Sequence, residues 1–334
     1  MKKVWIDITN VPHVNFLLPI INHFRKKVEF IFTVRDFAET KSLFENKISY
    51  EYRLIGDHRG KSKLFKVFGM INRTFELYKE IPVFDIKISV GGDASNYVAK
   101  IKNKKSITFD DNDKAPNWRY SKFTDYAFWP KAIPINKLIK QGFKNNKIYQ
   151  YDGLKEHFYI ADYKPSPQFK SKIPFDNYIV VRPENINANY VSSSLSITQK
   201  LVDKLISNGY NIIYLPRYKH DLGYVKKNDA IFIPDGPLSG LDLCYYSSAV
   251  LSGAGTLTRE AACLGKPAIS FYAGRELLTV DQYLINEDKL FHSRDVDEIV
   301  TKLDNVKSSE ADLEKPKRVK IEIISKLEEL IFNL

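Results

Sequence analysis

A loop of small residues, placed between an apolar run and a helix-like segment, is the part of this sequence best suited to bind a phosphate. The apolar run ends at Leu251. The loop consists of Ser252, Gly253, Ala254, Gly255 and Thr256. Small residues let a ligand approach the backbone, and a helix that begins there presents unpaired N–H groups and the positive end of its dipole. The alternative is that the glycines only permit a tight turn and that Gly265 and Pro267 only end the helix.

Glu260 favours binding over a turn alone. With Thr256 as the N-cap, a capping box would place a glutamate at position 259, where the sequence has Arg259. Capping therefore does not explain Glu260. A carboxylate one turn into a phosphate-binding helix can instead accept hydrogen bonds from both hydroxyls of a ribose. We therefore favour a nucleotide-phosphate site at this loop.

Other polar side chains also follow apolar runs. His13 comes after the first run, near the start of a helix-like segment, where a neutral imidazole can act as a general base. The alternative is a histidine that caps its helix or bonds the backbone. Arg182 follows a later run and can bind a phosphate through its planar guanidinium.

Carboxylates follow two further runs. Asp93 lies in the loop after the first of these, and Asp111 lies in the cluster 110–113 after the second. Carboxylates that lie close together raise one another's pKa, which suits one of them to act as an acid. A divalent-cation site and simple loop caps are the alternatives, because Asp and Asn favour both settings.

The elements that would position these residues alternate along the chain. Short runs of Val, Ile, Phe and Tyr alternate with amphipathic stretches of helical length, which is typical of an α/β fold with parallel sheets. We expect two doubly wound Rossmann-like lobes that face a cleft, at residues 1–150 and 177–334, joined by a Pro-containing linker at 151–176. Ligands of such sheets bind at the carboxyl ends of the strands, where the polar loops lie.

The charge composition of the chain limits the classes of binding partner to be expected. The chain has 334 residues and a net charge of +11, and residues 1–150 carry 28 Lys and Arg against 15 Asp and Glu. The segment 61–80 mixes basic and large apolar residues, so it can lie on an anionic membrane. Alternatively, Leu64, Phe68 and Ile71 form a core face and the lysines are solvated. Neither a zinc-finger spacing nor an RNA-recognition signature is found, so no nucleic-acid partner is expected.

Cysteine usage and hydropathy indicate the compartment. Cys244 and Cys263 are too few for a disulfide framework and have no metal-ligand spacing, so a reducing cytoplasm is expected. No apolar run approaches the roughly 20 residues that span a bilayer. Peripheral contact with the inner face of a membrane stays open.

Two segments resemble known proteins. The segment 252–267, with its Gly-rich loop, helix glutamate and Gly-Lys-Pro exit, is similar to the donor-site signature of GT-B-fold enzymes. These include the peptidoglycan N-acetylglucosaminyltransferase and the non-hydrolysing UDP-N-acetylglucosamine 2-epimerase. The segment 5–13, which contains Asn10 and His13, resembles the opening of domain-of-unknown-function family 354, placed in the same superfamily.

The resemblance implies roles for several residues. Gly253, Ala254, Gly255 and Thr256 would face the pyrophosphate of a nucleotide-sugar, and Glu260 would hold the ribose. Asp281 and Gln282 match a sugar-contacting segment of the transferase, with a solvated helix start as the alternative. Asn10 belongs to the polar loop that these families place after the first strand. The epimerase loop has an active-site histidine before its arginine, whereas Val181 precedes Arg182 here.

The expected function is therefore a glycosyltransferase that uses a nucleoside-diphosphate sugar in cell-surface glycan or glycolipid synthesis. His13, Asp93 and Asp111 would be its catalytic residues, and an acidic or lipid-linked acceptor would bind the basic amino-terminal lobe. No cofactor or metal is expected. A sugar-nucleotide 2-epimerase is the alternative within enzymes, because Asp93 and the acidic cluster suit elimination and re-addition. A non-catalytic module that binds membrane or nucleic acid is the alternative of another class.

Overall fold

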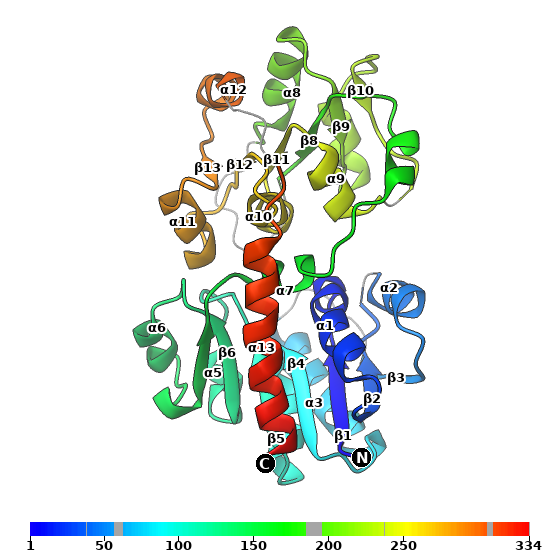
Figure 1. Cartoon of the computed structure of the whole chain (residues 1–334), viewed down its shortest axis with the longest axis vertical. Coiled ribbons are helices and arrows are strands. Elements are labelled where there is room, and N and C mark those ends of the chain that lie inside the picture. Colours follow the sequence, from blue (N-terminus) through cyan, green and yellow to red (C-terminus); the bar gives the residue numbers. More distant parts are fainter. Residues whose placement is uncertain (38, 57–62, 185–195, 237, 306–309, 334) are drawn as a thin grey trace. The chain divides into compact units, whose positions relative to one another are not determined.

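The computed structural model describes the chain except for residues 38, 57–62, 185–195, 237, 306–309 and 334, and except for the side chains of 63–66 (Figure 1). It divides into two compact units. Unit 1 comprises residues 1–159 and 317–334, and unit 2 comprises residues 160–316.

Unit 1 is built on a seven-stranded parallel sheet with the order β3-β2-β1-β4-β5-β6-β7. Its strands are β1 (Lys3–Ile8), β2 (Glu29–Val34), β3 (Tyr52–Leu54), β4 (Ile86–Val90), β5 (Lys105–Phe109), β6 (Tyr126–Pro130) and β7 (Ile148–Tyr151). The order reverses between β1 and β4. In doubly wound sheets, ligands bind at the carboxyl ends of the strands at such a reversal.

Helices cover both faces of this sheet. They are α1 (Val11–Phe24), α2 (Thr40–Lys47), α3 (Lys63–Glu80), α4 (Asp93–Ile101), α5 (Trp118–Ser121), α6 (Ile135–Lys140) and α7 (Lys155–Ile160), followed by α13 (Glu314–Phe332) at the end of the chain. Successive side chains of a strand point to opposite faces. Trp5 of β1 accordingly packs in one cluster with Leu77 of α3 and Val98 of α4. On the other face, Phe16 of α1 packs edge-on against Phe109 of β5.

The last helix, α13, belongs to unit 1 from residue 317 onward. Glu328 accepts a hydrogen bond from Lys27 (2.5 Å), and Phe332 packs near Phe24 of α1. Figure 1 shows this helix lying over the sheet of unit 1. The sequence places 317–334 in the carboxy-terminal lobe instead, because the amphipathic pattern of a helix shows that one face is buried but not which sheet buries it.

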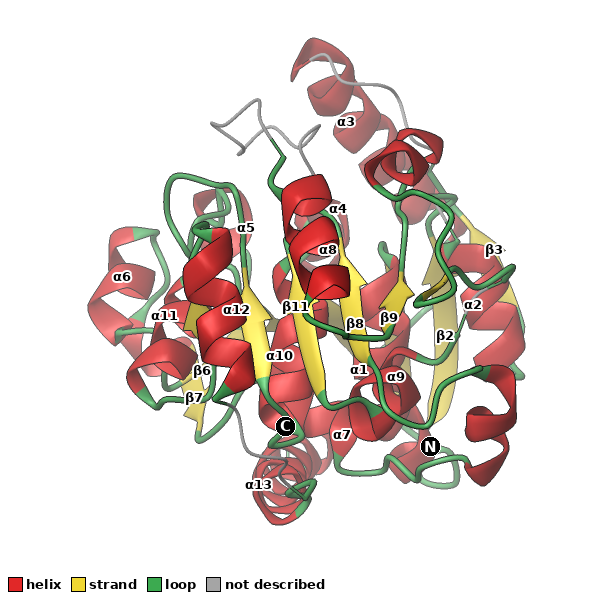
Figure 2. Ribbon diagram, turned by 90° about the horizontal axis from the view of Figure 1, so that it is seen from above, coloured by secondary structure: helices red, strands yellow, loops and turns green. Residues whose placement is uncertain are grey.

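Unit 2 has a six-stranded parallel sheet with the order β10-β9-β8-β11-β12-β13, which reverses between β8 and β11. Its strands are β8 (Ile179–Arg182), β9 (Ile212–Tyr214), β10 (Ile231–Phe232), β11 (Ala249–Ser252), β12 (Ala268–Ser270) and β13 (Phe291–His292). Its helices are α8 (Thr198–Ser207), α9 (Gly240–Tyr246), α10 (Gly255–Cys263), α11 (Thr279–Asn286) and α12 (Val296–Asp304). Figure 2 shows helices on both sides of the strands, and α8 and α12 share one core cluster with the sheet. The expected α/β class, with two doubly wound parallel sheets, is confirmed.

Three 3₁₀ helices complete the elements, at Asn145–Lys147, Pro167–Lys172 and Lys219–Tyr224. The second of these and α7 lie within 151–176, where the sequence predicts an irregular linker.

Two buried charges of unit 1 share the face covered by α3 and α4. Asp7 of β1 is fully buried, and its carboxylate accepts hydrogen bonds from Arg73 of α3 (2.6 Å) and Thr33 (2.7 Å). Burial alone would raise the pKa of Asp7, but the charge and hydrogen bonds of Arg73 hold it below its ordinary value. Lys87 of β4 is also fully buried and donates hydrogen bonds to Ser89 (2.5 Å) and Asn96.

Lys87 gives the stability of the fold a specific pH dependence. Burial lowers the pKa of Lys87 from 10.5 to about 7, with the charge of Asp7 acting in the opposite direction. Between these values the unfolded chain binds the proton and the folded chain does not, so the contribution of Lys87 to stability rises with pH. Relative to Lys87→Met, the wild type is expected to gain about 2 kcal/mol of unfolding free energy between pH 7 and 9, measured by urea denaturation. Parallel pH profiles for the two proteins would contradict this.

Candidate functional site

The two loops at the strand reversal of unit 2 are in direct contact. The N–H of Gly253, after β11, donates to the carbonyl oxygen of Arg182, at the end of β8 (2.9 Å). A Cβ atom on Gly253 would lie 2.5 Å from the Cα of Glu184. Gly253 is therefore required by the close approach of the two loops. The structure thus brings together Arg182, Ser252 and Gly253, which the sequence singled out.

Helix α10 begins at Gly255, immediately after this contact. Its N-cap is Ala254, which makes no side-chain capping bond. Ser252 instead bonds the backbone N–H and carbonyl groups of Ala254 (3.0 Å each), which fixes the loop. Since the N-cap is Ala254 and not Thr256, a capping box would need its glutamate at 257, which is Leu257. Glu260 is again not explained by capping.

Glu260 is buried on the face of α10 that meets α9. Its Oε2 lies 3.3 Å from the position that a Cβ on Gly240 would occupy, so this glycine leaves room for the carboxylate. After burial, the charge of Glu260 is the second factor that raises the pKa of the Cys244 thiol.

An ion pair adjoins the first turn of α10. Arg259 contacts Asp281 of α11 at 3.0 Å, and both side chains are buried. A Cβ on Gly255 would lie 2.3 Å from Nη1 of Arg259, so the guanidinium occupies the space beside this glycine. The solvated alternative is thus wrong for Asp281. Gln282 is exposed and donates to Asn286 (3.1 Å).

Glu184 is a buried residue of this site that the sequence does not single out. It accepts hydrogen bonds from Ser196 (2.6 Å), Thr198 and the N–H of Ile197 (3.0 Å), and it contacts Arg294 at 3.2 Å. It therefore anchors the loop that follows β8 to the start of α8. Its position just after a buried strand was the available signal.

At the strand reversal of unit 1, His13 follows β1 in the first turn of α1. Its Nδ1 lies 3.2 Å from Oγ1 of Thr9. Burial, and then the positive charge of Lys155, lowers the pKa of His13 to about 3. The imidazole is therefore neutral near pH 7. Asn10 is the exposed N-cap residue of α1 and makes no side-chain capping bond.

Asp93 follows β4, the neighbouring strand, as the first residue of α4. Gly91 and Gly92 before it have positive φ values of 59° and 114°, which side chains rarely adopt. Burial raises the pKa of Asp93, and Arg119, at 3.8 Å, opposes this. Because β1 and β4 are adjacent, the helix starts that carry His13 and Asp93 follow neighbouring strands.

The acidic cluster after β5 is largely neutralised within unit 1. Asp111 is buried and pairs with Lys155 at 3.0 Å. Asp110 accepts a hydrogen bond from Tyr120 (2.6 Å), and burial followed by the charge of Asp111 raises its pKa. Asp113 pairs with Lys137 at 3.1 Å. In the part of the chain that the structure describes, no group of three or more His, Cys, Asp or Glu residues is arranged to hold a metal ion.

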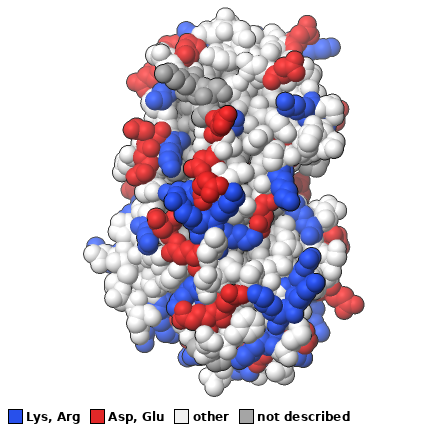
Figure 3. Space-filling view, viewed as in Figure 1, with Lys and Arg blue, Asp and Glu red and all other residues white. Residues whose placement is uncertain are grey.

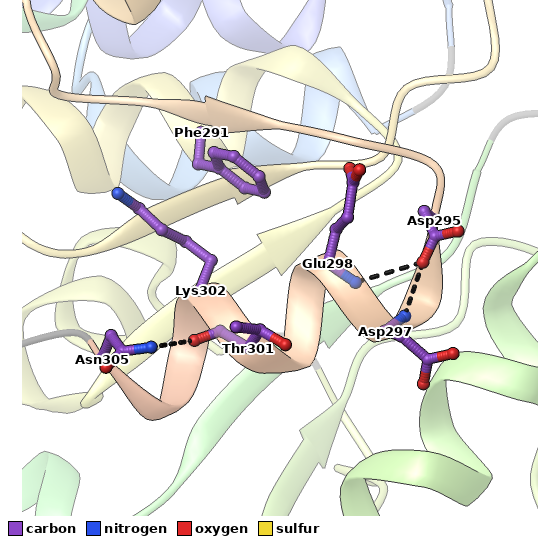
Figure 4. A pocket seen from close by; sticks show the side chains of 7 residues that line it. All are labelled: Phe291, Asp295, Asp297, Glu298, Thr301, Lys302 and Asn305. Carbon is purple, nitrogen blue, oxygen red and sulfur yellow. Dashed lines mark hydrogen bonds between the residues drawn. The ribbon is translucent and has the colours of Figure 1, made fainter.

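A hollow of about 540 Å³ beside α12 is a less suitable ligand site. Asp295, one of its three acidic residues, caps α12 by accepting from the N–H groups of Asp297 (2.8 Å) and Glu298 (3.1 Å), as Figure 4 shows. Lys302 lies over the ring of Phe291. The polar groups of this hollow therefore serve the helix and do not converge on a ligand.

The surface charges are mixed on the face drawn in Figure 3, where Lys and Arg side chains alternate with Asp and Glu. None of the helices in the described residues combines the length and the apolar character needed to span a bilayer.

Comparison with solved structures shows the fold that this chain shares. The UDP-GlcNAc 2-epimerase of Methanocaldococcus jannaschii is similar with a TM-score of 0.69 and 17% identity, over 97% of this chain and 99% of that one. A glycotransferase of kitacinnamycin is similar with a TM-score of 0.64 and 7% identity, over 99% and 98%. At these identities the likeness concerns the fold, which is GT-B-like with two Rossmann-like sheets.

Sequence comparison shows the family. An uncharacterised protein of Methanocaldococcus jannaschii is 30% identical over 316 residues, which cover 89% of each chain. The family model described as protein of unknown function (DUF354) matches residues 2–334. The resemblance of the segment 5–13 to this family is thereby confirmed, and the chain belongs to DUF354.

Proposed function

We propose that the protein is a glycosyltransferase that binds a nucleoside-diphosphate sugar on unit 2 and an acidic or lipid-linked acceptor on unit 1. One observation carries the proposal: the loops after β8 and β11 touch at the strand reversal, where α10 begins without a side-chain cap. A helix N-terminus at the carboxyl edge of a parallel sheet is a site that favours phosphate. Cell-surface glycan or glycolipid synthesis is the pathway class that such an acceptor suits.

On the donor side, the backbone supplies most of the recognition. The N–H groups at the start of α10 face the diphosphate, and the guanidinium of Arg182 stabilises the charge of the departing diphosphate. Glu260 accepts hydrogen bonds from the ribose hydroxyls. The pair of Arg259 and Asp281 fixes the first turn of α10 against α11, so in this proposal Asp281 positions the helix next to the sugar, and Gln282 contacts the sugar from the exposed side.

On the acceptor side, Asp93 is the best matched general base. A base is most effective when its pKa lies near the working pH, and burial raises the pKa of Asp93 toward that range. The low pKa of His13 makes it a weak base but keeps it neutral, so it accepts a hydrogen bond from the acceptor and orients it. Asp111 pairs with Lys155, so its negative charge offsets the positive charge of this lysine next to the acceptor. Asn10, exposed at the start of α1, adds a polar contact to the acceptor.

Two further features support the proposal. The fold is shared with proteins whose names include a UDP-GlcNAc epimerase and a glycotransferase. Cys244 and Cys263 are both buried and neither forms a disulfide, which suits a cytoplasmic location.

Calorimetric titration with UDP-, GDP-, CDP- and dTDP-sugars tests the donor site. At least one of these is expected to bind, and Glu260→Ala is expected to weaken its binding by about 10- to 100-fold, since charge-assisted hydrogen bonds are lost. Glu287→Ala removes an exposed glutamate of the same unit and is the control, with unchanged affinity. The proposal is wrong if no nucleotide-sugar binds, or if both variants bind alike.

A sugar-nucleotide 2-epimerase is the second candidate. The raised pKa values of Asp93 and Asp110, whose loops follow the adjacent strands β4 and β5, favour it, because epimerisation needs groups that take up and return a proton. Val181 at the position of the epimerase histidine counts against it. Turnover in deuterated water separates the two reactions, because an epimerase places deuterium at the inverted sugar carbon and a transferase does not.

A further inference from the structure

Helices α3 and α4 carry a cluster of large apolar side chains that the fold leaves in solvent. The cluster consists of Val67, Phe68, Ile71, Phe75, Tyr78 and Ile101, each between 44% and 62% exposed. We call it the α3–α4 patch. Isolated exposed apolar side chains are common, but a contiguous group of this size marks an interaction surface.

The exposure of this cluster tests the core-face interpretation of the segment 61–80. If the apolar residues of α3 formed a core face, Phe68 and Ile71 would be buried. The residues of α3 that face the sheet are instead Leu77 and Arg73, and the guanidinium of Arg73 forms an ion pair with Asp7. The core interpretation is therefore wrong for Phe68 and Ile71, which lie in solvent, while the side chain of Leu64 lies outside the described part of the chain.

The patch includes a shallow groove between the two helices. It has a volume of about 410 Å³ and is lined by Met70, Ile71, Thr74, Phe75 and Tyr78 of α3 and by Tyr97 and Ile101 of α4. The hydroxyl of Thr74, a polar group in this lining, donates to the carbonyl oxygen of Met70 (2.8 Å). The groove therefore offers a mainly apolar surface in which the hydroxyl of Thr74 is already hydrogen-bonded.

Lysines border the patch. The ammonium of Lys79 lies 4.4 Å from the ring centre of Phe75, and that of Lys102 lies 4.7 Å from the ring centre of Tyr78. Lysine stems cover apolar surface while their charges stay in water, which is the arrangement of membrane-interface residues. Residues 1–150 also carry the whole basic excess of the chain.

This charge favours a lipid surface over a second copy of the chain. A two-fold dimer would place the same patch, with its lysines, against itself, and lysine is depleted at the cores of protein interfaces. An anionic bilayer accepts both features, because its headgroups attract lysine and its acyl region accepts aromatic and aliphatic side chains.

We propose that the α3–α4 patch docks unit 1 onto an anionic membrane, with Phe68, Ile71 and Phe75 entering the acyl boundary and Lys79 and Lys102 contacting headgroups. Asp93, Tyr97 and Ile101 are spaced four residues apart on α4, so they share one face of that helix. A lipid-linked acceptor would reach Asp93 along this face. That consequence rests on the proposed function, whereas the docking itself does not.

Vesicle cosedimentation of the full chain tests the docking. Binding is expected to vesicles of phosphatidylcholine with about 30% phosphatidylglycerol, and to weaken when salt is raised from about 0.1 M to about 0.5 M. The variant Phe68→Ser/Ile71→Ser/Phe75→Ser is expected to bind at least about tenfold more weakly. The matched control is Leu222→Ser/Ile321→Ser, which removes exposed apolar residues outside the patch and should bind as the wild type does.

Two results would overturn the proposal. One is the absence of wild-type binding to anionic vesicles, or binding that the patch variant and the control retain equally. The other is a dimer in sedimentation velocity that the patch variant dissociates while vesicles bind neither protein. Thermal unfolding of each variant verifies that it is folded. Loss of nucleotide-sugar binding would end the proposed function without affecting these outcomes.

Discussion

Replacing Arg73 with methionine is expected to lower the free energy of unfolding by about 3–5 kcal/mol. The guanidinium of Arg73 lies 2.6 Å from the carboxylate of Asp7, which is fully buried between β1 and α3. Without Arg73 this carboxylate would lose its ion-pair partner and keep only the hydrogen bond from Thr33 and the charge of Lys87. Urea denaturation at pH 7, followed by circular dichroism, measures the change.

Arg119→Met is the matched control for this variant. Arg119 lies 3.8 Å from Asp93, and both side chains are partly exposed, so its loss is expected to cost no more than about 1 kcal/mol. The pKa of Asp7 is lowered from its ordinary value of 3.8 in the folded wild type. The contribution of the ion pair to stability is therefore lost as the pH falls from 3.8 through this lowered pKa. The difference between wild type and Arg73→Met should therefore shrink in acid. Equal losses for the two variants at pH 7 would contradict the account.

Gly253→Ala is expected to disrupt the donor loop. The new Cβ would lie 2.5 Å from the Cα and the Cγ of Glu184, and Glu184 is held by Thr198 and Arg294, so the loop itself must move. Overpacking of this kind costs about 1–3 kcal/mol, and displacement of the phosphate-binding backbone is expected to reduce nucleotide-sugar affinity at least about tenfold. Thermal unfolding and calorimetric titration measure the two effects.

Gly223→Ala makes the same chemical change in the same unit where a Cβ would meet no atom within 4 Å. It should leave nucleotide-sugar affinity unchanged. If Gly253→Ala binds as tightly as Gly223→Ala, the loop after β11 does not contact the ligand.

Much of the fold could be predicted because parallel strands between helices leave a repeated apolar pattern. Trp5 and Leu251 lie in runs that the structure buries as β1 and β11. The return of α13 to unit 1 could not be predicted, since its apolar stripe fits either sheet. From the sequence alone, Arg73 is one of the basic residues of the segment 61–80. Its burial depends on Asp7, 66 residues away, which no local pattern reveals.

In the candidate site, too, some features could be predicted from local sequence and others depend on the tertiary fold. The strand-end position of Arg182 and Gly253 predicted that they belong to one edge, and the adjacency of β8 and β11 brings them into contact. The roles of Glu184 and Arg259 depend on contacts made by the tertiary fold. The sequence pattern assigns the small size of Gly255 to the approach of a ligand, whereas in the structure the guanidinium of Arg259 fills the space next to it.

Hydrogen–deuterium exchange with and without UDP tests the central claim most directly, because the claim concerns backbone N–H groups. UDP is expected to slow exchange in the segment 253–257, at the start of α10, and to leave the hollow beside α12 unchanged. Protection confined to α12, or no protection in unit 2 at saturating UDP and the other nucleoside diphosphates, would contradict it.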